Sequence, residues 1–199
     1  MGVYKLSAAG GLATPRTNYS SFLAGNPAVT FTSYESIATV TVGSGGAADV
    51  TFSSIPSTYK HLQIRAIARS TRASGVDDMS IKVNGSSSNG SSHILYGTGS
   101  SASAAGYTGY IPFVSYFPTA GTGSNVFSAI VIDILDYTDT NKYKTLRTFT
   151  GFDNNGSGYI SLNSNLALDT TAISSIVFLM NNGNIVEYSQ FALYGIKGS

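Results

Sequence analysis

The chain contains neither cysteine nor tryptophan, and only 11% of its 199 residues are charged, with a formal net charge of +1. The absence of cysteine excludes disulfides and thiolate metal sites, so stability must come from packing and assembly. A charge balance this close to neutral is not that of an electrostatically driven nucleic-acid binder, and we expect no nucleic-acid partner. No apolar run reaches the ~18 residues of a membrane span, and none at the N-terminus fits a signal peptide. We therefore expect a soluble protein with no membrane span and no secretion signal of its own.

Residues that carry chemistry are also scarce. The sequence has two histidines, His61 and His93, so any histidine-based triad would have to use one of them. His61 falls within a strand pattern and is expected to be an exposed strand residue rather than a base. Asp133 and Asp136 are an odd number of positions apart on one predicted strand, so they point to opposite faces and do not form the carboxylate pair of a glycosidase. The sequence predicts no catalytic residue, no cofactor and no enzyme.

Aspartate and asparagine gather at a few positions where a calcium site is an alternative to a simple turn. One group is Asp133, Asp136, Asp139 and Asn141, and another is the run 153–155. Calcium takes six to eight oxygen ligands, but neither group matches a calcium-loop pattern. Turn formation by these side chains is the favoured interpretation, and no metal site is predicted. Asp77 and Asp78 are likewise expected to form a solvated turn.

Alternation of apolar and polar residues is the main signal that is present. In the segment 50–70, VTFSSIPSTYKHLQIRAIARS, a proline corner joins two predicted strands, and the second places its even-numbered apolar residues on one face. The segment 126–137, VFSAIVIDILDY, is so rich in branched apolar residues that we expect it to be buried on both faces in the centre of a sheet. About ten such strands separated by glycine- and asparagine-rich turns predict an all-β fold over residues 35–199, an antiparallel β-sandwich of jelly-roll type.

Residues 1–34 differ from the rest of the chain because they are rich in small residues and turn formers and show no periodicity. Fully extended, ~30 residues can reach on the order of 100 Å. The segment is therefore predicted to be an extended N-terminal arm that is held by a neighbouring copy or by another protein of an assembly. The alternative is an arm that folds back over its own domain. The residues available to anchor it are Tyr4, Leu6, Tyr19, Phe22 and Leu23.

Residues 85–125 are expected to form a long loop region with short strands, because serine, glycine and alanine surround two aromatic islands there. Loops on a rigid sheet are a common place for binding function. Aromatic side chains in these islands could stack on a host surface glycan, or could form the contacts between copies in an oligomer. These candidates are Tyr96, Tyr107, Tyr110, Tyr116 and Phe117.

Four segments resemble a family of virion structural proteins of tailed bacteriophages, particularly phages of cyanobacteria and marine bacteria. They are TFSSIPSTYKHLQIRAIARS (51–70), IDILDYTDTNKYKTLRTFTGFDNNGSG (132–158), SSIVFLMNNGNIVEYSQFALYGIKGS (174–199) and NYSSFLAGNPAV (18–29). Together they cover most of the chain, and the closing FALYGIK is a distinctive signature. The family is described as structural, tail-associated or fibre-like, so the resemblance implies a place in the virion and implies no catalytic residues.

Together with the residue patterns, the resemblance leads us to expect a non-enzymatic virion component that is assembled in the host cytoplasm. It would be a surface-displayed β-sandwich whose N-terminal arm anchors it to the capsid or tail, as a head decoration or cement protein or as a fibre or baseplate module. Its expected partners are other virion proteins and itself, in a homotrimer or another ring, because exposed sandwich edges and aromatic loops need covering. The alternative is a tail module that binds a host-receptor glycan.

Overall fold

The computed structural model describes residues 33–86, 90–109 and 112–198. The chain divides into two units, Met1–Thr32 and Ser33–Ser199, and only the second is described. The five candidate anchor residues of the predicted arm, Tyr4, Leu6, Tyr19, Phe22 and Leu23, lie outside the described residues, as does Tyr110. The arm therefore stays a prediction from the sequence.

The described residues form twelve β-strands and no helix, which confirms the all-β class. The strands are β1 (Tyr34–Thr41), β2 (Asp49–Phe52), β3 (His61–Ala68), β4 (Asp77–Val83), β5 (Gly90–Gly97), β6 (Ala102–Thr108), β7 (Phe113–Phe117), β8 (Ser128–Leu135), β9 (Lys144–Asp153), β10 (Gly158–Ala167), β11 (Ile176–Met180) and β12 (Gln190–Ile196).

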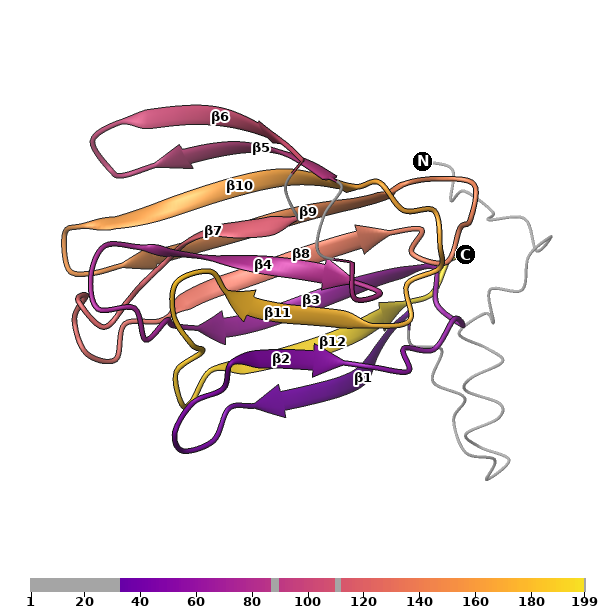
Figure 1. Ribbon diagram of the computed structural model, residues 1–199, viewed down its shortest axis with the longest axis horizontal. Coiled ribbons are helices and arrows are strands. Elements are labelled where there is room, and N and C mark those ends of the chain that lie inside the picture. The colour runs from indigo at the N-terminus through magenta and orange to yellow at the C-terminus, as the bar shows by residue number, and fades with distance from the viewer. Residues whose placement is uncertain (1–32, 87–89, 110–111, 199) are drawn as a thin grey trace, which may run out of the picture. The chain divides into compact units, whose positions relative to one another are not determined.

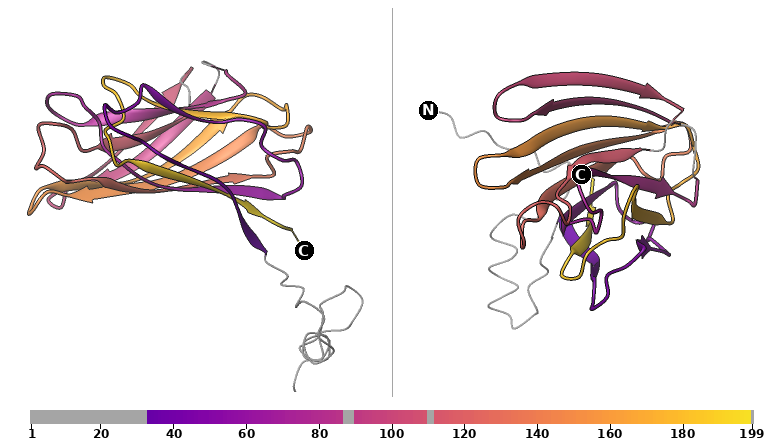
Figure 2. Two further views of the ribbon diagram at one scale, coloured as in Figure 1. Left: turned by 90° about the horizontal axis from the view of Figure 1, so that it is seen from below. Right: turned by 60° about the vertical axis from the view of Figure 1, so that its left-hand side comes forward.

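The strands pair into two antiparallel sheets that lie one over the other (Figures 1 and 2). The larger sheet has the order β1-β12-β3-β8-β9-β10-β5-β6, and the smaller has the order β2-β11-β4-β7. One continuous apolar core joins them, and within it Phe178 of β11 stacks on Phe191 of β12 with ring centroids 5.3 Å apart. The β-sandwich predicted from the sequence is confirmed, whereas the jelly-roll type is not confirmed by this strand order and stays a prediction.

The proline corner between β2 and β3 carries the chain from the smaller sheet to the larger one. The hydroxyl of the buried Tyr137 donates a hydrogen bond to the carbonyl of Pro56 and so closes the corner. Beyond it, Leu62 and Ile64 of β3 are fully buried while Arg65 faces solvent, as the alternation of the sequence predicted.

The prediction that residues 126–137 are buried on both faces is wrong. β8 does lie inside the larger sheet, between β3 and β9, but its side chains alternate. Ile130 and Ile132 face the core, whereas Ala129 is exposed and Val131 is half-buried on the opposite face. The reason is that the smaller sheet covers only one face of the larger sheet, so within the described residues the outward apolar side chains of β8 have no layer above them.

Residues 85–125 were expected to be a long loop region with short strands. Strands are present, and they are more extensive than expected, because this region contributes β5, β6 and β7. β7 is the edge of the smaller sheet and contacts β9 and β10. β5 and β6 follow β10 in the larger sheet and extend beyond that edge (Figure 1). We call β5 and β6 the wing. Because the wing extends past the smaller sheet, a step is left between the wing and the edge strand β7. Aromatic residues of this region line that step.

Candidate functional site

A cleft of about 220 Å³ lies in this step, between the inner face of the wing and strands β4 and β7. We call it the tyrosine cleft. It is lined by Val76, Asp78, Ser80, Ile94, Tyr107, Phe113, Ser115, Tyr116 and Asn181. Two of the five aromatic residues singled out from the sequence, Tyr107 and Tyr116, therefore line one depression although they lie on different sheets.

A β-bulge in β7 sets the position of Tyr116. In the pairing of β4 with β7, Asp77 stands opposite Phe117 and Met79 opposite Val114, so two residues of β7 face the single residue Asp78. Tyr116 adopts a φ of 63°, in the left-handed region that non-glycine residues seldom occupy. Its backbone amide donates a hydrogen bond of 3.0 Å to Oδ1 of Asp78, which holds the bulge.

The bulge directs the Tyr116 ring into a stack that crosses from one sheet to the other. Tyr116 stacks on Tyr159 of β10 with ring centroids 4.6 Å apart, and its centroid also lies 4.6 Å from that of Tyr96 on β5. Burial and a hydrogen bond with the Tyr96 side chain raise the pKa of Tyr116, so its phenol stays neutral at ordinary pH. Tyr107 packs edge-on against Phe113 at 5.5 Å. The sequence did not point to Tyr159, since it lies beside a predicted hairpin turn.

The prediction that Phe117 contacts a glycan or a neighbouring copy is wrong. Its side chain is fully buried and belongs to the hydrophobic core. It follows the bulge, and the alternation of the strand turns it toward the space between the sheets. Phe117 thus has no exposed surface to offer a glycan or a neighbouring copy.

The expectation of a solvated turn at Asp77 and Asp78 is wrong as well. Asp77 is 1% exposed, and its carboxylate accepts hydrogen bonds from the Ser70 hydroxyl at 2.6 Å and from the Asn182 side-chain amide at 2.9 Å. Asp78 is half-buried in the wall of the cleft, and burial raises its pKa, with the neighbouring Asp77 acting in the same direction. Asn182 lies more than a hundred positions away in the sequence, so the pattern around Asp77 could not reveal it.

The polar groups of the tyrosine cleft are suited to binding a neutral polar ring. The Ser80 hydroxyl donates to the Asn181 side-chain carbonyl at 2.7 Å on one wall, and the Asp78 carboxyl lies on the same strand as Ser80. The Tyr107 and Tyr116 rings supply aromatic surface. Small-molecule sites usually measure about 300–1,000 Å³, so a cleft of about 220 Å³ would admit one small ring rather than a long chain.

Both histidines lie outside the tyrosine cleft. His61 of β3 is half-buried and its Nδ1 accepts a hydrogen bond of 3.0 Å from the amide of Asp136, so it holds the turn after β8 rather than standing exposed as expected. His93 is exposed on β5, and its ring lies against Gly106 of β6. Each histidine therefore takes part in a structural contact, and neither lines the cleft.

The aspartates considered for calcium are held by cationic and amide side chains. Asp136 pairs with Lys60 and Lys142 at 2.8 Å each, and these lysines hold the pKa of its carboxyl well below the usual range. Lys142 also pairs with Asp139 at 3.1 Å, while Asp133 accepts a hydrogen bond from Gln63. Among residues 33–86, 90–109 and 112–198, no group of three or more histidine or acidic side chains is placed to hold a metal ion.

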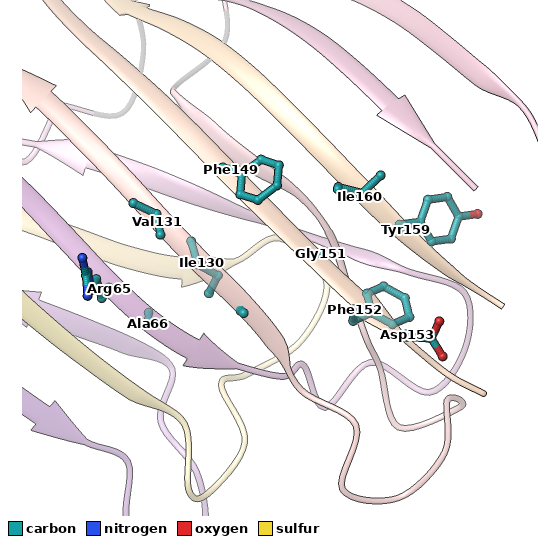
Figure 3. A pocket seen from close by; sticks show the side chains of 11 residues that line it. Arg65, Ala66, Ile130, Val131, Phe149, Gly151, Phe152, Asp153, Tyr159 and Ile160 are labelled. Atoms are coloured by element: carbon teal, nitrogen blue, oxygen red, sulfur yellow. The ribbon is translucent and has the colours of Figure 1, made fainter. Parts of the chain in front are cut away.

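The outer face of the larger sheet carries a second feature, which sequence reasoning missed. Apolar side chains lie exposed on adjacent strands there. Six of them are 43–55% exposed, namely Ile67, Leu95, Leu135, Phe149, Ile160 and Leu162. We define the outer apolar patch as Ala129, Val131, Phe149, Ile160, Leu162 and Leu95. A shallow depression of about 560 Å³ lies within it, between Phe149 and Ile160 and over Gly151 (Figure 3). The apolar run of β8 was the one signal available, and it was attributed to burial on both faces.

No helix in the described part of the chain is long and apolar enough to cross a membrane. Comparison of the chain with models of protein families, with curated proteins and with solved structures finds no match.

Proposed function

We propose that the protein is a non-enzymatic structural component of a tailed-phage virion, a surface-displayed β-sandwich held on the capsid or tail as a decoration, cement, fibre or baseplate module. The observation that carries the proposal is the outer apolar patch, because contiguous exposed apolar surface on a rigid sheet is typical of a site that another protein covers. The resemblance of four segments to virion structural proteins supports the same role.

The remaining parts of the proposal follow from this role. The partners are other virion proteins and further copies of the chain, and the N-terminal arm is the anchor. Side chains that could serve catalysis are engaged in structural contacts, as with Asp77, His61 and Asp136, which supports a role without chemistry or cofactor. The place of action is the virion, after assembly in the host cytoplasm.

Removal of residues 1–33 tests the anchoring part of this proposal. The truncated chain retains every described strand, so it should fold and still fail to join particles when it replaces the full chain during phage assembly. Occupancy is measured by quantitative mass spectrometry of purified particles, with circular dichroism of the truncated protein as the folding control. Incorporation at normal occupancy would contradict an anchoring arm.

Binding of a host-surface glycan is the second candidate, and the tyrosine cleft favours it. Aromatic faces next to a carboxyl, a hydroxyl and an amide are the groups that recognise a sugar ring, and Tyr107, Asp78 and Ser80 bring them together in one depression. In this case the protein would be a receptor-binding module of the tail.

A glycan array probed with the full chain tests this candidate. Binding should be lost in Tyr107→Ala and retained in Tyr143→Ala, which removes an exposed tyrosine that does not line the cleft. Retention of binding in Tyr107→Ala would place the sugar elsewhere, and absence of binding at millimolar glycan would refute the candidate.

A further inference from the structure

The outer apolar patch has a pattern of large and small residues that repeats from strand to strand. On each of three strands a large outward residue stands two positions from a small one. These pairs are Val131 and Ala129 on β8, Phe149 and Gly151 on β9, and Leu95 and Gly97 on β5. The sheet register aligns the large residues in one row and the small residues in the next. A row of large residues therefore crosses the strands, and we call it the ridge; Leu162 of β10 continues it. In the neighbouring row Ile160 of β10 is large and 53% exposed, so the depression of that row is centred on Gly151, between Ala129 and Ile160.

A large side chain beside a depression, as Phe149 is beside Gly151, is self-complementary under one kind of symmetry. A two-fold axis that lies in the plane of the contact, perpendicular to the strands, and crosses β9 at Thr150 reverses the strand direction and places the ridge of one copy over the neighbouring row of the other. Phe149 of each copy then faces Gly151 of the other, over the depression of about 560 Å³ that Gly151 lines. Sheets that pack face to face keep their strands aligned within about 30°, which fits this arrangement.

The same two-fold axis also brings together opposite charges that flank the patch. Arg147 and Asp153 are both exposed on β9, and each lies three positions from Thr150. The same axis brings Arg147 of one copy to Asp153 of the other, twice in each pair. The opposite alignment, with parallel strands, would place Arg147 against its own copy and Phe149 against Phe149, so it is disfavoured.

Arg147 has no ion pair within its own chain in the described residues, where no carboxylate lies within 4.0 Å of it. Asp133 stands opposite Arg147 in the β8–β9 register, but its Oδ1 accepts a hydrogen bond of 2.8 Å from the Gln63 amide. Phe149 with the depression at Gly151, and Arg147 with Asp153, therefore each have a complement in a second copy of this face.

We propose that the outer apolar patch is a two-fold contact with a second copy of this chain, in which the β9 strands run antiparallel and Phe149 inserts over Gly151 of the second copy. An isologous contact of this kind closes on itself and yields a dimer. The trimer or ring expected from the sequence would need a heterologous contact instead. The dimer goes beyond the proposed virion role and does not depend on it, because it is tested on the purified protein.

Sedimentation equilibrium of the full chain with charge-reversed variants tests the contact. The wild type should be a dimer. R147D and D153R should each weaken dimerisation at least about tenfold, because each variant places like charges against one another at both ends of the contact. An equimolar mixture of the two variants should recover dimers close to wild-type affinity, since each reversed charge then meets its opposite. Lys82→Asp on β4 of the smaller sheet makes the same change in net charge as R147D, but outside the contact, and should have no effect.

Recovery in the mixture requires that residue 147 of one copy meets residue 153 of another, so a general effect of charge on solubility would not produce it. Phe149→Ala supplies an independent test of the ridge and should also weaken the dimer, without unfolding, because Phe149 is half exposed. A monomeric wild type, a trimer insensitive to R147D, or a mixture that stays monomeric would each overturn the proposal.

Discussion

The raised pKa of the Asp78 carboxyl makes the electrostatics of the tyrosine cleft measurable. Its pKa lies above the usual value near 3.8, chiefly because burial disfavours the charged carboxylate, while the hydrogen bond from the Tyr116 amide acts in the opposite direction. A carboxyl with a raised pKa in the folded state binds its proton more tightly there than in the unfolded chain. Its contribution to stability is therefore complete below the unfolded pKa and is lost as the pH rises through the folded pKa.

Asp78→Asn should remove the loss of stability that ionisation of Asp78 causes as the pH rises. The asparagine carbonyl can still accept the Tyr116 amide, but the side chain no longer ionises. We expect the variant to be more stable than the wild type by an amount that grows as the pH rises above the unfolded pKa near 3.8 and shrinks at acid pH. Urea unfolding at a series of pH values measures it, with Asp49→Asn at the exposed start of β2 as the control. A difference that does not change with pH would contradict the assignment to Asp78.

Gly195 explains at the residue scale why the closing FALYGIK contains a glycine. A Cβ at this position would overlap the ring of Tyr59, which lies across it and packs against the core. The Tyr59 hydroxyl donates to Glu35 at 3.1 Å, which keeps the ring in place. β12 thus needs a residue without a side chain where Tyr59 crosses it.

Gly195→Ala should destabilise the protein by about 1–3 kcal/mol, the range for an added methyl group in a packed site. Tyr59→Ala removes the obstructing ring, so the same glycine substitution should cost much less in that background. A double-mutant cycle by urea unfolding measures the coupling. Additive effects would show that the ring does not limit this position.

Among the strands, β7 is held at one edge by side-chain hydrogen bonds. Its free edge is bonded by side chains of β10 rather than by backbone. Asn165 accepts from the Phe113 amide at 3.1 Å and donates to the Phe113 carbonyl at 3.2 Å, and Asn163 donates to the Ser115 hydroxyl at 2.9 Å. These asparagines are buried. They tie the smaller sheet to the larger one at the tyrosine cleft.

Asn165→Leu should loosen β7 more than the rest of the fold. The leucine fills a similar volume but leaves the Phe113 amide and the Ser92 hydroxyl without their partner, and each buried unsatisfied group costs about 1–3 kcal/mol. Hydrogen exchange should show faster exchange at Phe113 and neighbouring amides of β7. Exchange that accelerates equally in β3 would instead indicate a global loss of stability. Ser92→Ala, which removes only one partner of Asn165, should have the smaller effect.

The sequence predicted strands well where side chains alternate strongly. β3 lies where the alternation placed it, with its buried and exposed faces as expected. β5 and β6 were expected only as short strands within a loop, and their extent was not predicted, because serine, glycine and alanine give almost no contrast between the two faces of a strand. The inference for β8 failed for another reason, since apolar residues were assumed to mean burial, whereas on its outer face they form part of an exposed patch.

The candidate site was predictable only in part. The aromatic islands pointed to Tyr96, Tyr107 and Tyr116, which the structure does gather near one cleft. The bulge that aims Tyr116 and the partners of Asp77 depend on contacts between distant strands. A single sequence shows periodicity within a strand, but it does not show which strands become neighbours.

At the scale of the whole molecule, the two faces of the larger sheet have different roles. The inner face forms the core with the smaller sheet, and the outer face carries apolar side chains with nothing above them in the described chain. Such a surface favours association with another protein over the monomeric state. The proposed two-fold contact and the proposed place in a virion both depend on this outer face being covered in the assembled state.

The most direct test of the virion role is the location and copy number of the protein in purified particles of the phage that encodes it. Quantitative mass spectrometry gives the number of copies, and fitting the β-sandwich into particle density gives their position. The proposal predicts a fixed copy number, with density for the sandwich on the capsid or the tail. Absence of the protein from purified particles, with its presence only in infected-cell extract, would contradict a structural role in the virion.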